Sequence, residues 1–314
     1  MLEIYKTQES GNELLSLDVI EKGCWIDLVA PTEEELELVI KSIKLEEHNM
    51  LRDPLDDEEK PRVEIEEGQT LIIVDTPYVY EEDQTIKYET VPMGLLLVHD
   101  DYIITICSKR SSVLERFRNG QIRDLYTFKK TRFILQILYN IAKDFLKYLR
   151  HIDKKSEFLE DSLHKSIRNK ELYKLLELSK SLVYFTTSLK SNEIVLERLL
   201  NGKIIKFYED DSELLEDTII ENKQAIEMAN IYSSILSGMM DAYASIISNN
   251  QNNVMKFMTA MTIVMAIPNM VYSFFGQNFY IPGDGNPFMW LYVFLGSVVL
   301  ALIVAYFLNK RDMF

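Results

Sequence analysis

The stretch DAYASIISNNQNNVMKFMTAMTIVMAIPNMVYSFFG, residues 241–276, decides how the rest of the chain is interpreted. Steps of four and three residues in turn stay on one face of a helix. That face, the polar stripe, consists of small, polar and methionine side chains: Asp241, Ser245, Ser248, Asn252, Met255, Thr259, Thr262, Ala266, Asn269, Ser273 and Gly276. Its second half lies in a segment apolar enough to enter a bilayer, where lipid cannot satisfy polar groups. We therefore expect the stripe to face water, ions or a partner helix.

Two C-terminal segments have the length and composition of membrane-spanning helices. Residues 254–275 contain a single charge, Lys256, and residues 287–308 contain none. Each segment has about the 20 residues that an apolar helix needs to cross the hydrocarbon core. We predict a transmembrane domain, 254–314, with two spans joined by a short external loop, 276–286.

The orientation of these spans follows from the flanking charges. Lys256 opens the first span, and Lys310 and Arg311 follow the second, whereas the loop 276–286 has no lysine or arginine. Positive flanks stay on the cytoplasmic side of a membrane. The sequence therefore predicts a multi-pass protein of the cell membrane with both termini in the cytoplasm.

The composition restricts the possible partners of the chain. Its 314 residues carry a formal net charge of −15, which argues against nucleic acid and suits a surface that concentrates cations. Cys24 and Cys107 are expected to be buried thiols, because two cysteines make no disulfide framework. No phosphate-binding loop or nucleophile–base pair stands out, so we expect neither enzyme activity nor an organic cofactor.

The N-terminal part, residues 1–126, is predicted to be a cytoplasmic α/β domain. Thr32 followed three residues later by Glu35 predicts a helix that begins with a capping box. Runs rich in β-branched, aromatic and aliphatic residues predict strands at 24–29, 70–80, 88–98 and 102–107. The order in which these strands pair is left open.

Residues 127–253 are predicted to form a stalk region of long helices. The segment has no proline, and its apolar residues recur at helical spacing, with breaks expected near Asn169 and at 202–211. We expect the last helix to run unbroken from Ser212 to Phe275, on the order of 90 Å, which is longer than a bilayer is thick. A coiled-coil tether is the alternative for these helices, although no leucine seam persists.

Several copies of the chain are needed if the polar stripe is to enclose a path for ions, because one helix cannot do so. Asn252 would then form a ring of amides, Asp241 a ring of carboxylates below it, and Thr259 would line the path. Met255 and Met258 would form an apolar constriction that gates by losing water. Such oxygen donors suit a hard cation such as Mg²⁺, which keeps its water shell.

Simpler explanations compete for parts of this pattern. Small residues in a membrane helix usually mark close packing against another helix, which would account for Ala266, Ser273 and Gly276. Met255 and Met258 are equally expected in a core or against lipid.

The first span closes with Tyr-Ser-Phe-Phe-Gly-Gln-Asn-Phe at 272–279. Together with the paired C-terminal spans, the short loop, Ser248-Asn249, Asn252 and residues 254–256, this motif resembles the CorA family of magnesium and divalent cation channels. The likeness covers the whole chain. It implies a funnel-shaped homopentamer that conducts Mg²⁺, with the first span lining the pore.

The resemblance also implies roles for the pore residues. Gly276 and Asn278 would form the outer ring that captures hydrated Mg²⁺, with Gln277 between them and Asp284 drawing cations toward it. Asn252 matches a pore-lining asparagine, Asp241 a carboxylate near the inner mouth, and Met258 the position of an apolar gate.

A regulatory Mg²⁺ site is implied as well. Asp217 matches an acidic residue that, in the family, shares an inter-subunit ion with a carboxylate of the neighbouring α/β domain. Here that partner would be Glu81, Glu82 or Asp83. Without the resemblance, Asp217 would be read as an ordinary solvated helix acid.

The motif departs from the family pattern at one central position. Gln277 stands where the family has methionine, and the loop acid, Asp284, is displaced by one residue.

This departure leaves alternatives for the substrate and for the function. Other residues occur at the middle position of the motif in zinc-transporting relatives, so Zn²⁺, Co²⁺ or Ni²⁺ is an alternative substrate. A non-conducting membrane scaffold or regulator is an alternative function. The expected partners are further copies of the chain, the lipid bilayer and divalent cations.

Overall fold

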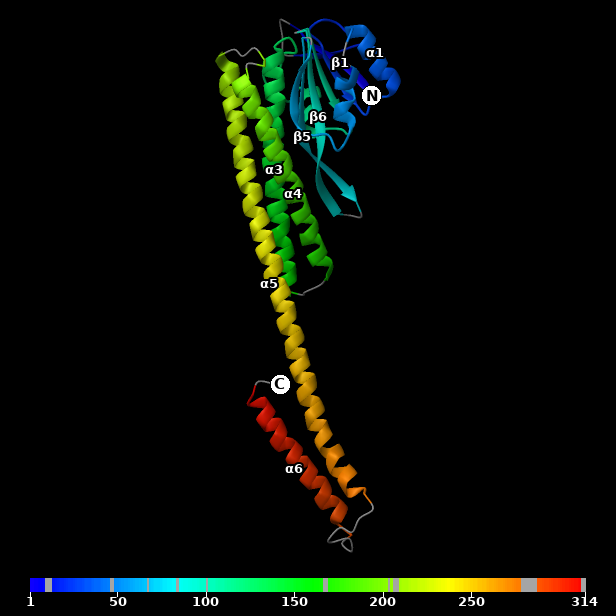
Figure 1. Cartoon of the computed structure of the whole chain (residues 1–314), viewed down its shortest axis with the longest axis vertical. Coiled ribbons are helices and arrows are strands. Elements are labelled where there is room, and N and C mark those ends of the chain that lie inside the picture. The colour runs from blue at the N-terminus through cyan, green and yellow to red at the C-terminus, as the bar shows by residue number, and fades with distance from the viewer. Residues whose placement is uncertain are drawn as a thin grey trace. The chain divides into compact units, whose positions relative to one another are not determined.

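The protein is described by a computed structural model that forms two compact units, Met1–Ser237 and Gly238–Phe314 (Figure 1). The residues that the structure describes are 1–8, 13–45, 48–66, 68–82, 85–99, 101–165, 169–202, 204–205, 209–277 and 287–311.

The first unit contains a mixed sheet, which in the described part of the chain has seven strands in the order β2-β1-β3-β7-β6-β5-β4. The strands are β1 Leu2–Thr7, β2 Leu14–Leu17, β3 Trp25–Val29, β4 Arg62–Glu66, β5 Gln69–Glu82, β6 Thr85–Val98 and β7 Tyr102–Cys107. Strands β3 and β7 pair in parallel and the other neighbours pair antiparallel. The long β5–β6 hairpin keeps its register from Gln69 opposite Val98 to Glu82 opposite Thr85.

One face of the sheet is covered by α1 (Glu33–Ile43) and the short 3-10 turns η1 (His48–Leu51) and η2 (Asp53–Leu55). The predicted capping box at the start of α1 is confirmed, since Glu35 N donates to Thr32 Oγ1 (3.3 Å) and Thr32 N donates to Glu35 Oε2 (2.9 Å). Apolar side chains of α1 join the sheet in one buried cluster, with Leu36, Val39, Ile26, Leu28, Leu71 and Ile73 among its members.

The other face packs against α2 (Ser112–Arg118), α3 (Lys130–Lys165) and α4 (Asn169–Gly202). Asn192 on α4 pairs with the backbone of Asp75 on β5, donating to its carbonyl and accepting from its N–H, both at 2.8 Å. The predicted thiols Cys24 and Cys107 are buried and free.

The long helices follow the expected division. α3 ends at Lys165, α4 runs from Asn169 to Gly202, and α5 is one helix from Glu209 to Phe275, so the predicted unbroken helix is confirmed. Pro268 lies inside α5. The last helix, α6, spans Met289–Asn309, which confirms a second apolar C-terminal helix.

A buried ion pair fixes α2 to the sheet. Asp27 on β3 is 1% exposed, and its carboxylate accepts hydrogen bonds from Arg118 Nη1 (2.6 Å) and Thr105 Oγ1 (2.7 Å). Trp25 Nε1 donates to the same threonine hydroxyl at 2.8 Å. Burial raises the pKa of Asp27 to about 6, because its cost outweighs the lowering by Thr105 and Arg118.

The stability of the first unit is therefore expected to fall as the pH rises through the window from 3.8, the ordinary pKa of Asp27, to about 6. The folded state binds the proton more tightly than the unfolded state, so the Asp27 contribution is complete below this window and lost above it, about 3 kcal/mol in all. Asp27→Asn should flatten the slope, measured by thermal unfolding with Trp25 fluorescence. The exposed control Glu34→Gln should keep the wild-type slope, and an equal slope in Asp27→Asn would contradict the assignment.

Candidate cation pathway

The described residues of the predicted pathway lie exposed along α5. Asp241, Asn252, Met255, Met258 and Thr259 all have exposed side chains. Because α5 is unbroken, successive stripe members lie next to one another on its surface from Asp241 onward, and the stripe winds around the helix by about 20° per seven residues.

The threonine hydroxyls of the stripe are already held by the helix. Thr259 Oγ1 donates to the Met255 carbonyl and Thr262 Oγ1 to the Met258 carbonyl, each at 2.8 Å. A hydroxyl whose proton is used in this way presents its lone pairs outward. The face therefore offers oxygen acceptors, which suit cations.

The side of α5 opposite the stripe is the better buried one. Ala260 is 0% exposed, and Val264, Val271 and Phe275, which share its side, are half-buried. Helix α6 is joined to α5 by a hydrogen bond of 3.1 Å between the hydroxyls of Tyr272 and Ser297. The stripe is thus left uncovered within the chain.

The Tyr272–Ser297 bond was not foreseen from the sequence. Ser297 is 1% exposed, and its hydroxyl donates to the Phe294 carbonyl (2.8 Å), so the tyrosine hydroxyl is the donor to the serine. The sequence did contain a signal for such a bond, because the Ser297 hydroxyl lies in an apolar span and needs a hydrogen-bond partner there. Which residue on the other span supplies that partner depends on how the two helices pack.

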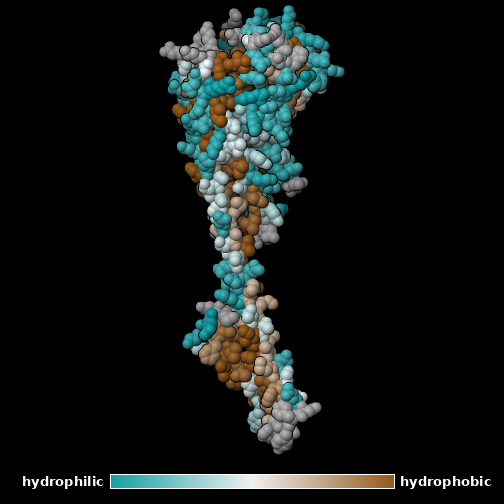
Figure 2. All heavy atoms as spheres, viewed as in Figure 1, coloured by the Kyte–Doolittle hydropathy of each residue, from teal (hydrophilic) through white to brown (hydrophobic). Residues whose placement is uncertain are grey.

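Both C-terminal helices expose their apolar side chains. Only 6% of the most apolar stretch of α5 and 11% of that of α6 is buried, whereas a core helix of a soluble protein is mostly buried. Figure 2 shows the resulting apolar surface over α6. Trp290 and Tyr306 are exposed near the two ends of α6, where membrane helices place aromatic residues at the interface. These features are those of a membrane protein.

The predicted outer ring begins where α5 ends. Gly276 N donates to the Tyr272 carbonyl (2.8 Å), and Gln277 N to the Phe274 carbonyl (3.4 Å). A Cβ at position 276 would lie 3.2 Å from the Tyr272 carbonyl oxygen, so a larger residue would be crowded. Asn278 and Asp284 lie outside the described residues.

The described members of the predicted regulatory set, Asp217, Glu81 and Glu82, form no metal-binding group. Asp217 on α5 and Glu81 and Glu82 at the end of β5 are exposed, and Glu82 forms an ion pair with Lys87. Asp83 lies outside the described residues. Among the residues that are described, no group of three or more histidine, cysteine, aspartate or glutamate side chains is placed to hold a metal ion. A site shared by two copies stays a prediction.

Known proteins are similar to this chain over most of its length. A model of the family described as CorA-like Mg²⁺ transporter protein matches residues 21–311. The cobalt/magnesium transport protein CorA of Methanocaldococcus jannaschii is 31% identical over 294 residues, covering 90% of this chain and 89% of the relative. The complete structure of that organism's CorA magnesium transporter superposes with a TM-score of 0.83 at 27% identity, covering 98% of this chain and 96% of its own. The cobalt/magnesium transport protein CorA of Thermotoga maritima is 22% identical, covering 83% and 75% of the two chains.

Proposed function

This chain belongs to the CorA-like Mg²⁺ transporter family and is a transporter of divalent cations, and we propose that its substrate is Mg²⁺, taken up into the cell. The observation that carries the proposal is the uncovered polar stripe of α5, whose opposite side is the better buried one. The membrane potential would drive uptake, since it is worth about 4.6 kcal/mol per 100 mV for a divalent ion.

We propose that the chain assembles with itself into a homopentamer in the cell membrane, with both termini in the cytoplasm. The first unit exposes many large apolar side chains on its helices, which single soluble domains avoid. They include Tyr173, Val183, Ile194, Ile220, Ile231 and Ile235. Burial of these side chains between copies would gather the polar stripes around a shared axis; the count of five rests on the family resemblance.

The proposed path runs from the outer loop to the cytoplasm. Asp284 and the ring of Asn278 and Gln277 attract hydrated cations, which then pass the stripe. The apolar constriction at Met255 and Met258 comes next, followed by the rings of Asn252 and Asp241. In this scheme residues 1–126 and 127–253 form the regulatory cytoplasmic domain and stalk, and 254–314 forms the pore.

Flux by the purified protein in liposomes tests this function. Uptake of Mg²⁺, Co²⁺, Ni²⁺ and Zn²⁺ should be measured with an imposed inside-negative potential, and Mg²⁺ uptake is expected. Gln277 is the residue that favours the alternatives. Zn²⁺ uptake without Mg²⁺ uptake would identify a transporter of the softer ions, and the absence of all flux would identify a scaffold.

Asp217→Ala is expected to weaken closure of the channel by cytoplasmic Mg²⁺. The proposed closing ion bridges Asp217 to Glu81, Glu82 or Asp83 of the next copy, and without it these carboxylates repel one another. Loss of one charged ligand should raise the Mg²⁺ concentration for half-inhibition of current by about tenfold or more. Glu216→Ala, a change of the adjacent exposed acid on α5, should leave the inhibition curve in place. An unchanged curve in Asp217→Ala would reject this site.

A further inference from the structure

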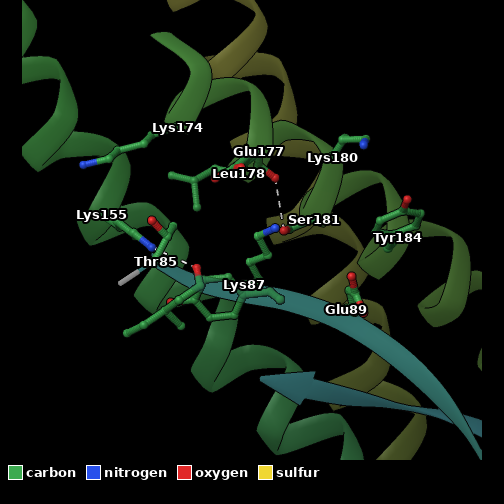
Figure 3. Close-up of a pocket in the computed structure, with 12 residues that line it drawn as sticks. Thr85, Lys87, Glu89, Lys155, Lys174, Glu177, Leu178, Lys180, Ser181 and Tyr184 are labelled. Carbon is green, nitrogen blue, oxygen red and sulfur yellow. Dashed lines mark hydrogen bonds between the residues drawn. The ribbon is translucent and has the colours of Figure 1, made fainter. Parts of the chain in front are cut away.

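A hollow of about 120 Å³ lies between the start of β6 and the helices α3 and α4 (Figure 3). Strand β6 contributes Thr85–Glu89, α3 contributes Lys155, and α4 contributes Lys174, Glu177, Leu178, Lys180, Ser181 and Tyr184. We call it the lysine pocket. It lies wholly within the unit Met1–Ser237 and belongs to none of the sites considered above.

The lysine pocket is positively charged in an acidic protein. Four lysines and two glutamates line it, and Glu82 pairs with Lys87, so the local net charge is +1, whereas the chain as a whole carries −15. Figure 3 shows Lys87 and Lys155 reaching into the space between β6 and α4, whereas the ammonium groups of Lys174 and Lys180 extend away from the space that these residues border. Like charges from three separate elements are costly to hold together unless something of opposite charge joins them.

The carboxylates nearby neutralise part of this charge, and the Glu177 carboxylate interacts with both Lys155 and Lys87. Lys87 forms an ion pair with Glu82, and Glu89 accepts a hydrogen bond from the Tyr80 hydroxyl at 2.7 Å. No described residue forms an ion pair with Lys155, Lys174 or Lys180. The described residues therefore leave the ammonium groups of these three lysines without an ion-pair partner.

Lys155 is the most deeply placed of these cations. Its Nζ donates to the Ile86 carbonyl (3.0 Å) and lies 5.7 Å from the centre of the Tyr88 ring. Burial, and then the charge of Lys174, lower the pKa of Lys155, and the charge of Glu177 offsets part of this lowering, so its ammonium is short of solvation. An ammonium carries three donors, and the carbonyl uses one of them.

We propose that the lysine pocket binds a compact anion with two or more phosphate groups, such as pyrophosphate. Lysine ammonium groups bind phosphate as point charges, and the cations that line this pocket are all lysines. The volume is below the roughly 300 Å³ at which pockets for larger organic ligands begin. The Thr85 hydroxyl supplies a further polar group at the lining, whereas the Ser181 hydroxyl already donates to the Glu177 carbonyl at 3.1 Å.

Bound pyrophosphate would join β6 to α3 and α4 through charge that the chain itself leaves unbalanced. The proposal concerns the first unit alone and does not depend on transport.

Titration calorimetry of the full-length protein in detergent, in buffer freed of divalent cations, should show saturable binding of one pyrophosphate per chain. Citrate, a compact anion whose charge resides on carboxylates, should bind at least tenfold more weakly.

Substitutions of lysines test whether pyrophosphate binds in the lysine pocket. Lys155→Gln combined with Lys174→Gln should weaken pyrophosphate binding at least tenfold, whereas Lys155→Arg should retain most of it. Lys190→Gln, on α4 but outside the lining, is the matched control and should bind as the wild type does. Thermal unfolding without ligand checks that each variant is folded. Absence of binding to the wild type, equal binding of citrate, or equal weakening by Lys190→Gln would overturn the proposal.

Discussion

Replacing Asn252 by leucine is expected to reduce divalent-cation uptake in liposomes to the background level. Asn252 is exposed on the stripe face of α5, and in an assembly every copy would present its side chain to the same path. A ring of leucines there would extend the apolar constriction formed by Met255 and Met258, where water is lost. A barrier higher by only about 2.7 kcal/mol slows passage about a hundredfold.

The matched control for this change is the next residue. Asn253→Leu makes the same substitution about 100° around the helix, toward the side of Ala260, which is buried. It should leave uptake close to the wild-type rate, because that side does not face the path. Equal losses in the two variants would mean that the stripe is not the pore lining. Equal retention would mean the same.

Asn278→Ala should have the second large effect, a loss of Mg²⁺ uptake of about tenfold or more at low external Mg²⁺. The amide is the predicted hydrogen-bonding group of the outer ring, and a hydrogen bond to a charged partner is worth roughly 1.5–3 kcal/mol. Capture of the hydrated ion is the step affected, so saturating Mg²⁺ should restore part of the rate. Uptake is measured with a fluorescent indicator inside the liposomes.

A second asparagine of the same loop separates capture from loop folding. Asn286→Ala removes the same group from the far end of the predicted loop, 276–286. It should leave both the rate and its Mg²⁺ dependence unchanged. If Asn278→Ala also transports normally at low Mg²⁺, the outer ring is not formed by this amide.

Local patterns in the sequence were enough to predict α1, the long helices and the strands β3, β5, β6 and β7, whereas β1, β2, β4 and α2 were not predicted. The Thr32–Glu35 capping box and the unbroken helix through residues 212–275 depend on neighbours three or four positions away. The strand order depends on distant residues instead. For example, β3 pairs with β7 across about eighty intervening positions, as in Trp25 opposite Ile103. Local composition cannot determine such a pairing.

The same distinction holds for the sites. The stripe is visible in the sequence because its members share one helix, whereas the lysine pocket joins Lys87, Lys155 and Lys174 from three elements. Its lysines look like ordinary solvated charges until the chain folds. The regulatory site is further removed still, since Asp217 would need a second copy of the chain to complete it.

Pro268 gives the first span an uneven stiffness. A proline has no N–H to donate, so the helix hydrogen bond from residue 268 to the Val264 carbonyl is missing. The helix bends most easily at this point. One turn further on, the Tyr272–Ser297 bond ties the outer end of α5 to α6. Flexing at the proline would therefore carry α6 along with the last turn of α5, so that the C-terminal end of α5 and the N-terminal end of α6 tilt as a pair.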